Sequence, residues 1–384
     1  MKKSFLVFAS ALLISCGNVP VSDGFVEAPL PKSEAALHFK ENLSAISSLD
    51  TFYDYSREIL PRKEGENFLY SPVSYYMSLC FLSTFEGMVT PSILTPMGTS
   101  GIDDIVSLGQ QIAEGVQWAS DNIVSARMTN LAIDFDHYYG EKQKEIFVNQ
   151  FHASFLSDYS KKDQYLNSWI SKLTDGNVKE MKGDTFEEGS FGFITGLYLN
   201  AVYLGGGFCS TFDGKFNETE EALFQKGDMC LRELTINDDY NAISIGLSFG
   251  RLGKGQARIL MPKKESLSSF LKGKALRSFF EGGDGGYHTV LTMPKQIITD
   301  SLDLGECTKD MGFISSDKVA LPAITQDSHL EFKEDGVYGY SLTQAPMIAT
   351  SIPNHEVTID RPYAFEILDP NGVTLFYGEA QTTK

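Results

Sequence analysis

The chain has 384 residues, of which 42% are apolar and 21% are charged, so it can form one large hydrophobic core or two moderate ones. An aromatic content of 12% is too high for an intrinsically disordered chain. Fifty acidic residues against 32 basic ones give a formal net charge of −18, which repels phosphate backbones and argues against a general nucleic-acid-binding protein.

The first sixteen residues have the pattern of a secretory signal. Lys2 and Lys3 precede an apolar stretch at 5–14, which is too short to span a bilayer because a spanning helix needs about twenty residues. The cysteine that follows, Cys16, resembles the lipidated cysteine of the bacterial lipobox, and a plain signal peptide with an incidental cysteine is the alternative. Gly17 stands where an Asp typically retains lipoproteins at the inner membrane, so the resemblance implies an outer-membrane anchor.

Residues 17–32 contain three prolines and no helical period, which predicts a flexible tether with a root-mean-square reach of roughly 20–25 Å. Residues 33–384 contain no repeat, low-complexity tract or long linker, so a single domain is expected there. We therefore expect a monomeric domain that a lipid anchor holds at a membrane, facing the cell surface or the periplasm. A secreted protein is the alternative.

Helical periodicity dominates the first part of this domain and strand patterns dominate the rest, which together predict an α+β fold. Helices are expected at 33–60, 74–85, 104–118, 141–151, 166–173 and 267–280. Strands are expected at 197–204, 242–249, 257–261, 289–293, 319–325, 356–368 and 373–378. Asp369-Pro370-Asn371-Gly372 separates the last two strands and is a strong hairpin signal, because Asn-Gly accepts positive φ angles.

Motifs that carry catalytic chemistry are missing from the sequence. The six histidines have no metal-ligand spacing, and there is no HExxH, Gly-x-Ser-x-Gly or P-loop motif, so neither a metal, a cofactor nor an enzymatic activity is expected. Gly205-Gly206-Gly207 lacks the context of a dinucleotide-binding loop and predicts a bulge at a strand end. An oxidising compartment permits two disulfides among Cys80, Cys209, Cys230 and Cys307, whereas a buried free thiol is equally compatible with Cys80 on its apolar helical face, so no pairing is predicted.

Six separated segments resemble segments of the serpin family in the same order. They are 67–74 (NFLYSPVS), 166–178 (LNSWI followed by TDGNV), 199–203 (LNAVY, continued by Phe212 and Thr219), 257–262 (ARILMP), 360–365 (DRPYAF) and 375–378 (LFYG). The resemblance implies eight or nine helices around three β-sheets, with an exposed reactive-centre loop at about 334–356.

The resemblance also implies a polar cluster under the main sheet, termed the shutter, formed by Ser71, Ser74 and Asn200. The histidine usual in this cluster aligns with Gln326, which can still donate a hydrogen bond. At the place where the loop begins to insert into the sheet, serpins usually have Lys and Trp. Gly205 and Phe208 stand there in this chain, so sheet opening is expected to be tuned differently.

The start of the loop, Glu334-Asp335-Gly336, fits an inhibitory serpin, but no run of alanines follows it. If the loop becomes a strand, its side chains alternate between two faces. The inward set is then small throughout: Val337, Gly339, Ser341, Thr343 and Ala345. The outward set is larger: Tyr338, Tyr340, Leu342 and Gln344. Residues 336–350 carry no charge, which favours insertion, whereas Gly339 weakens a strand, and a degenerate loop that need not insert is the alternative.

The usual spacing of the family, counted from Gly336, places the cleaved bond at Thr350–Ser351, give or take one or two residues. No Lys or Arg lies nearby, which argues against trypsin-like targets. The residues at 347–350 suit elastase-like proteases, or papain-like ones that recognise an apolar residue two positions before the cut.

These observations predict a suicide-substrate inhibitor of serine, or alternatively cysteine, endopeptidases. The protease nucleophile attacks the carbonyl of Thr350, and loop insertion then distorts the protease before deacylation. The alternative is a non-inhibitory serpin-fold lipoprotein that acts as a surface binding module, as the hinge without alanines and the residues Gly205 and Phe208 suggest. Cutting the loop should raise the melting temperature greatly in the first case and hardly at all in the second.

Overall fold

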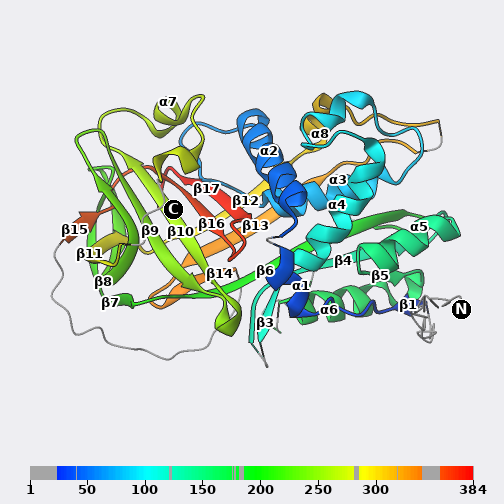
Figure 1. The fold of residues 1–384 in the computed structure, drawn as a ribbon, viewed down its shortest axis with the longest axis horizontal. Helices are drawn as coiled ribbons and strands as arrows, with labels where there is room; N and C mark the ends of the chain where they lie inside the picture. The colour runs from blue at the N-terminus through cyan, green and yellow to red at the C-terminus, as the bar shows by residue number, and fades with distance from the viewer. Residues whose placement is uncertain are drawn as a thin grey trace, which may run out of the picture.

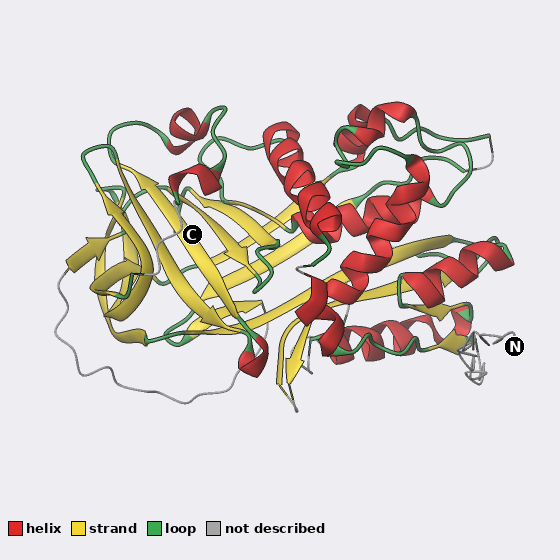
Figure 2. Ribbon diagram, viewed as in Figure 1, coloured by secondary structure: helices red, strands yellow, loops and turns green. Residues whose placement is uncertain are grey.

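The computed structural model describes residues 24–383 except 40, 121–122, 175, 177–178, 181–185, 281–284, 318 and 340–354. The predicted signal and Cys16 therefore lie outside the described residues. The described part of the chain contains eight α-helices, in agreement with the predicted α+β class (Figures 1 and 2). They are α1 (Ser33–Phe39), α2 (Leu43–Ile59), α3 (Pro72–Ser83), α4 (Ile102–Gly115), α5 (Glu141–Glu145), α6 (Lys162–Leu173), α7 (Leu267–Leu271) and α8 (Gly305–Met311).

The main sheet has the spatial order β1-β5-β4-β6-β14-β13-β12, and every neighbouring pair in it is antiparallel except β4 and β5. These strands are β1 (Phe25–Val26), β4 (Ile123–Asp134), β5 (Ala153–Leu156), β6 (Phe191–Tyr203), β12 (Ile297–Asp303), β13 (Thr325–Phe332) and β14 (Gly336–Gly339). The short strand β3 (Gln117–Ser120) pairs with the beginning of β4.

Two further sheets adjoin the main one at the end of the molecule opposite α5 and α8 (Figure 2). The first has the order β2-β17-β16-β10-β9-β8, with β2 (Phe68–Tyr70), β8 (Glu220–Ile236), β9 (Tyr240–Ser248), β10 (Lys254–Pro262), β16 (Tyr363–Leu368) and β17 (Thr374–Ala380). The second has the order β7-β8-β11-β15, with β7 (Gly206–Phe216), β11 (Tyr287–Pro294) and β15 (His355–Thr358). The long strand β8 belongs to both, and β6 of the main sheet pairs with β9, so hydrogen bonding links all three sheets.

Helices cover the main sheet on both faces. The inner face packs into the large core that α2, α3 and α4 complete, and this core includes Leu199 and Ala201 of β6. The outer face of β4 and β6 carries α6, whose Trp169 packs in a second, smaller cluster with Leu131 and Tyr198. Strand β6 is therefore covered on both faces along part of its length, because its side chains alternate between the two clusters. Among the described residues, no helix combines the length and the apolar character needed to cross a bilayer.

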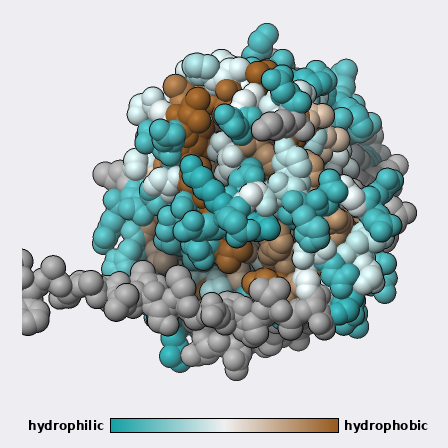
Figure 3. All heavy atoms as spheres, turned by 90° about the vertical axis from the view of Figure 1, so that its right-hand side faces the viewer, coloured by the Kyte–Doolittle hydropathy of each residue, from teal (hydrophilic) through white to brown (hydrophobic). Residues whose placement is uncertain are grey.

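Polar and charged residues dominate the end of the molecule seen in Figure 3, with apolar patches between them. Scattered apolar side chains on a protein surface are normal and by themselves indicate no binding site.

The predicted C-terminal hairpin is confirmed, since β16 and β17 pair across the turn and Gly372 has a φ of 86°. Other expectations were wrong. The single helix expected at 33–60 is two helices, α1 and α2, and the single strand expected at 356–368 is two strands, β15 and β16. The helix expected at 267–280 is broken after α7, where Gly273 adopts a φ of 67°. The strand expected at 319–325 is irregular up to the start of β13. The tether expected at 17–32 does not stay free to its end, because β1 pairs with β5.

Candidate functional site

The first residues of the predicted reactive loop form a strand inside the main sheet. β14 lies between β6 and β13, with Val337 opposite Ala201 on one side and Phe332 on the other. The Val337 side chain is fully buried in the large core. Residues 336–339 of the predicted loop are therefore part of the main sheet in the intact chain.

Gly336 is required by close backbone contact and not by an unusual φ angle. A Cβ atom built on Gly336 would lie 2.3 Å from the carbonyl oxygen of Ala201 and 2.8 Å from the Cα of Val202. Side chains do not tolerate such distances, so any other residue here would push β14 away from β6.

The two faces expected for the loop are confirmed at the first two positions. Val337 faces the core, and Tyr338, the next residue, faces the outer side, with the ammonium of Lys333 4.8 Å from its ring centroid. Tyr338 is nevertheless only 2% exposed, so this face is less open than the sequence suggested. Burial raises the pKa of the Tyr338 hydroxyl, which therefore stays protonated.

Backbone hydrogen bonds hold the point where the loop enters the sheet. The amide of Tyr203 donates to the carbonyl of Asp335 (2.8 Å), and the amide of Phe208 donates to the carbonyl of Glu334 (2.7 Å). The carboxylate of Glu334 also accepts a hydrogen bond from the Lys295 ammonium (2.5 Å), and this interaction lowers the pKa of Glu334. The ring of Phe208 packs edge-on against Tyr203 at 5.9 Å, which fills the position where a Trp is usual.

The glycine run beside this entrance forms a turn, whereas a bulge was expected. Gly205, with a φ of 75°, lies between β6 and β7, and Gly206, with a φ of 154°, is the first residue of β7. The register shift between β7 and β8 occurs later, between Phe208 and Ser210. Gly207 permits the loop to approach, because a Cβ there would lie 2.9 Å from the carbonyl oxygen of Glu334.

Beyond β14, the space between β6 and β13 is an open groove. Within the described residues these two strands form no direct ladder with each other. The groove has a volume of about 590 Å³ and is polar along much of its length. Most of its lining comes from β13 (Asp327, Ser328 and His329) and β12 (Thr299, Asp300 and Ser301), and Leu197 of β6, Lys63 and Phe376 complete it.

Part of the predicted shutter assembles at the N-terminus of α3. The Ser71 hydroxyl contacts that of Ser74 (3.1 Å) and caps the helix by accepting from the Ser74 amide. Gln326 of β13 binds the backbone of Ser71 twice, accepting from its amide (2.7 Å) and donating to its carbonyl (3.1 Å). Thr195 of β6 donates to the carbonyl of Ser74 (3.1 Å), so the cluster joins α3 to β6 and β13, the strands on the two sides of the groove.

Asn200, the third residue predicted for the shutter, lies on the opposite face of the sheet. Its neighbours Leu199 and Ala201 both point into the large core, so the alternation of β6 directs Asn200 to the outer face. Thr195 lies on the same face of β6 as Leu199 and Ala201, and it occupies the shutter in place of Asn200. The sequence motif gave the position of Asn200 along the strand but not its face.

The far end of the loop returns to the sheet formed by β7, β8, β11 and β15. β15 pairs in parallel with β11, and Glu356 forms an ion pair with Lys226 of β8 (2.9 Å). The predicted cleavage site, Thr350–Ser351, and the hinge residue Ser341 lie outside the described residues.

The four cysteines of the described residues are free thiols in this structure. Cys80 and Cys307 are buried, and burial raises the pKa of both thiols. The reading as free thiols, which the sequence left open beside two disulfides, is the one that the structure supports.

Comparisons with known proteins match these features. The model of the family described as Serpin (serine protease inhibitor) matches residues 50–382. Serpin-Z2B of Triticum aestivum is 23% identical over 365 residues, which cover 83% of this chain and 90% of that protein. Serine proteinase inhibitor 2.4 of Apodemus sylvaticus is 18% identical and covers 93% of this chain and 95% of its own length.

Solved structures share the fold. An Arabidopsis serpin in its native stressed conformation superimposes with a TM-score of 0.68 at 15% identity, over 90% of this chain and 98% of the other. Human thyroxine-binding globulin complexed with thyroxine gives 0.68 at 16% identity, over 91% and 100%. Since the family match spans most of the sequence and the loop, sheets and helices agree with it, the chain belongs to the serpin family, whose members are generally protease inhibitors and not enzymes.

Proposed function

We propose that this serpin inhibits serine endopeptidases as a suicide substrate, that it is cleaved near Thr350–Ser351, and that its target is elastase-like. A papain-like cysteine protease is the other target class that the apolar residues before the bond would suit. The observation that supports trapping best is the position of β14, which starts an inserted strand directly above an open groove.

The register of β14 extends into that groove. Tyr338 pairs with Asn200 on β6 and with Glu331 on β13, and each further loop residue would advance one position along both strands. Positions 340–342 would then meet Gly196 to Tyr198 and Asp327 to His329, which include four residues that line the groove. The loop would thus gain a hydrogen-bonded ladder on each side.

Trapping would follow from the order of events. The protease attacks the carbonyl at Thr350, and the resulting ester ties it to the N-terminal part of the cut loop. Insertion of that part then carries the protease along the sheet and distorts its oxyanion hole, so the ester is not hydrolysed. The small inward residues Ser341, Thr343 and Ala345 allow the strand to enter without a buried charge.

We further propose that lipid on Cys16 anchors the mature protein to the outer membrane, at the cell surface or in the periplasm, as a monomer. The sequence around Cys16 is the support for this part of the proposal.

A binding module without inhibition is the second candidate function. Two observations favour it: the absence of alanines after Gly336, and the replacement of the usual Trp by Phe208 at the loop entrance. The fold likeness to a hormone-binding protein shows that serpin-fold proteins also carry ligands.

The test is to mix the mature protein with neutrophil-type or pancreatic elastase and to analyse the products on denaturing gels. We expect a band at the summed mass that resists denaturation, and a released fragment that begins at Ser351 or within two residues of it. Clean cleavage with undiminished protease activity would contradict inhibition of these targets. A melt of the cut product then decides between the two functions, since only an inserting loop raises the melting temperature strongly.

A further inference from the structure

The N-terminal segment at 24–30, which we call the strap, lies against the edge of the main sheet. Phe25 and Val26 pair with Leu156 and Phe155 of β5. The carbonyl of Gly24 accepts a hydrogen bond from the amide of Ser157 (2.7 Å) just after β5. The strap thus adds a short strand to the sheet edge that lies farthest from the insertion groove on the β6 side.

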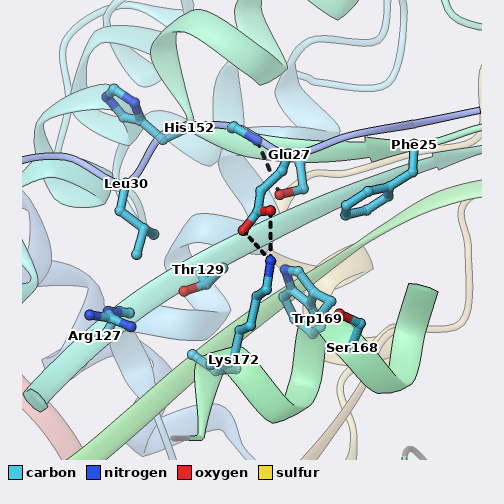
Figure 4. Close-up of a pocket in the computed structure, with 12 residues that line it drawn as sticks. Phe25, Glu27, Leu30, Arg127, Thr129, His152, Ser168, Trp169 and Lys172 are labelled. Atoms are coloured by element: carbon cyan, nitrogen blue, oxygen red, sulfur yellow. Dashed lines mark hydrogen bonds and ion pairs between the residues drawn. The ribbon is translucent and has the colours of Figure 1, made fainter. Parts of the chain in front are cut away.

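The strap also holds α6. The ring of Phe25 stacks on Tyr165 with centroids 4.6 Å apart and planes at 12°. Figure 4 shows the Glu27 carboxylate, which binds the Lys172 ammonium at 2.7 and 2.8 Å. Ala28 is only 5% exposed, and its amide donates to the hydroxyl of Ser154 of β5 (3.3 Å). Residues 24–28 contact both β5 and α6, so the strap ties this helix to the sheet edge.

Under the strap, α6 and β4 pack incompletely. Phe25, Leu30, Thr129 and Trp169 line a small hollow there (Figure 4). The indole N–H of Trp169 and the hydroxyl of Thr129 are buried without a hydrogen-bond partner in the described structure. Buried donors without acceptors make the contact between α6 and β4 less favourable, so the contacts of the strap with β5 and α6 add binding that this contact lacks.

The position of α6 links the strap to loop insertion. A Cβ atom on Gly196 of β6 would lie 2.3 Å from a Leu173 methyl and 3.2 Å from the Trp169 ring, so α6 sits directly on β6. Strand β6 borders the groove that a fully inserted loop would fill. Neighbouring strands lie about 4.8 Å apart, so a complete additional strand must shift β6 relative to β13, and the helix bound to β6 must shift or slide with it.

We propose that the strap is a latch that slows insertion of the intact loop by fixing α6 to β5. The latch rests on the proposed function only in that the loop must be able to insert. While Phe25 and Glu27 hold α6, the surface over β4 and β6 cannot rearrange independently of the sheet edge. Release of the strap lowers the barrier and lets the uncut loop enter the groove, which removes the bait from proteases.

The test compares single variants of the mature chain with the unchanged protein during incubation at 37 °C. The readouts are the fraction of loop that elastase can still cut and the fraction that has gained heat stability. Phe25→Ala should speed the conversion by about five- to tenfold, the range expected for loss of one aromatic pair. Glu27→Lys should speed it by about twofold, because the ion pair is half-exposed.

Two controls isolate the latch. Glu34→Gln removes a carboxylate from an exposed position of α1 nearby and should change nothing. The double variant Glu27→Lys/Lys172→Glu restores an ion pair with reversed charges and should return the rate to that of the unchanged protein. Conversion of Phe25→Ala at the unchanged rate, or failure of the charge swap to rescue, would overturn the latch.

Failure of the proposed function would look different. In that case the unchanged protein would be cut without trapping elastase and without gaining heat stability. Hydrogen exchange of the uncut protein then decides, because a strap that holds α6 predicts faster exchange in α6 and β5 of Phe25→Ala than in Glu34→Gln. Equal exchange in both variants would overturn the latch irrespective of inhibition.

Discussion

The two edges of β6 differ in how completely they are closed. On one edge, β6 pairs with β4 over nine consecutive residues, from Leu199 to Phe191, and α6 covers that seam. On the other edge it pairs with β14 over four residues, Val202 to Leu199, and the groove follows. Within the described residues, one edge of β6 is therefore paired along most of the strand, and the other edge is paired only over the four residues that face β14.

This difference between the two edges of β6 shows how a sheet can leave a place for one more strand. Unpaired strand edges invite another strand, and most proteins cover or blunt them. Here the segment best placed to fill the edge is the chain's own loop, whose first four residues already lie in register. Closing the rest requires a loop that is long enough and uncharged, as residues 336–350 are, and a shift of β6 with α6 that makes room for the strand.

A charge at position 337 should have the largest effect on protease trapping. Val337→Asp places a carboxylate in the large core, where burying an unpaired charge opposes insertion by several kcal/mol. We expect elastase to cut this variant without being trapped, and the cut protein to melt no higher than the uncut one.

Val337→Thr is the matched control, because it has nearly the same shape and carries no charge. It should retain most of the trapping activity. A stable protease complex formed by Val337→Asp would show that burial of position 337 is not needed for inhibition.

A side chain at Gly336 should weaken the pairing of β14 with β6. Gly336→Ala brings a methyl group against Ala201 and Val202, and overpacking of this kind costs about 1–3 kcal/mol. Hydrogen exchange should accelerate at the amides of Ala201 and Tyr203. Gly140→Ala is the control, because a Cβ there meets nothing within 4 Å. Equal protection in the two variants would contradict the close packing of β14 on β6.

The shutter should contribute to holding β13 against the start of α3. Gln326→Leu leaves the amide and the carbonyl of Ser71 without their partners, which should lower the free energy of unfolding by about 1–3 kcal/mol in urea titrations. Asp327→Asn, at the exposed neighbouring position, should change it by less than about 0.5 kcal/mol. A Gln326→Leu protein as stable as Asp327→Asn would show that this contact is not a structural link.

Sequence patterns predicted the elements whose signals are local. The C-terminal hairpin followed from Asn371-Gly372, and the N-terminus of α3 lies where the Ser71-Pro72 segment predicts a helix start. Asn200 could not be placed correctly, because a motif fixes the position along a strand and a shift of one residue reverses the face. The family segments likewise gave the loop but not the ladder of β14 with β6, which depends on contacts between residues more than 130 positions apart.

The smallest expected effect concerns the ion pair at the loop entrance, which lies outside the ladder. Lys295 lowers the pKa of Glu334 below its ordinary value of about 4.5, so the pair stabilises the folded state above that pH, and the contribution is lost as the pH falls through the lowered pKa. Both side chains are partly exposed, so Glu334→Gln should lower the free energy of unfolding by less than about 1 kcal/mol at pH 7. The difference from the unchanged protein should vanish toward pH 3. If it instead persists at low pH, the Glu334 side chain acts by packing and not by charge, and the backbone bonds of Tyr203 and Phe208 alone hold the entrance.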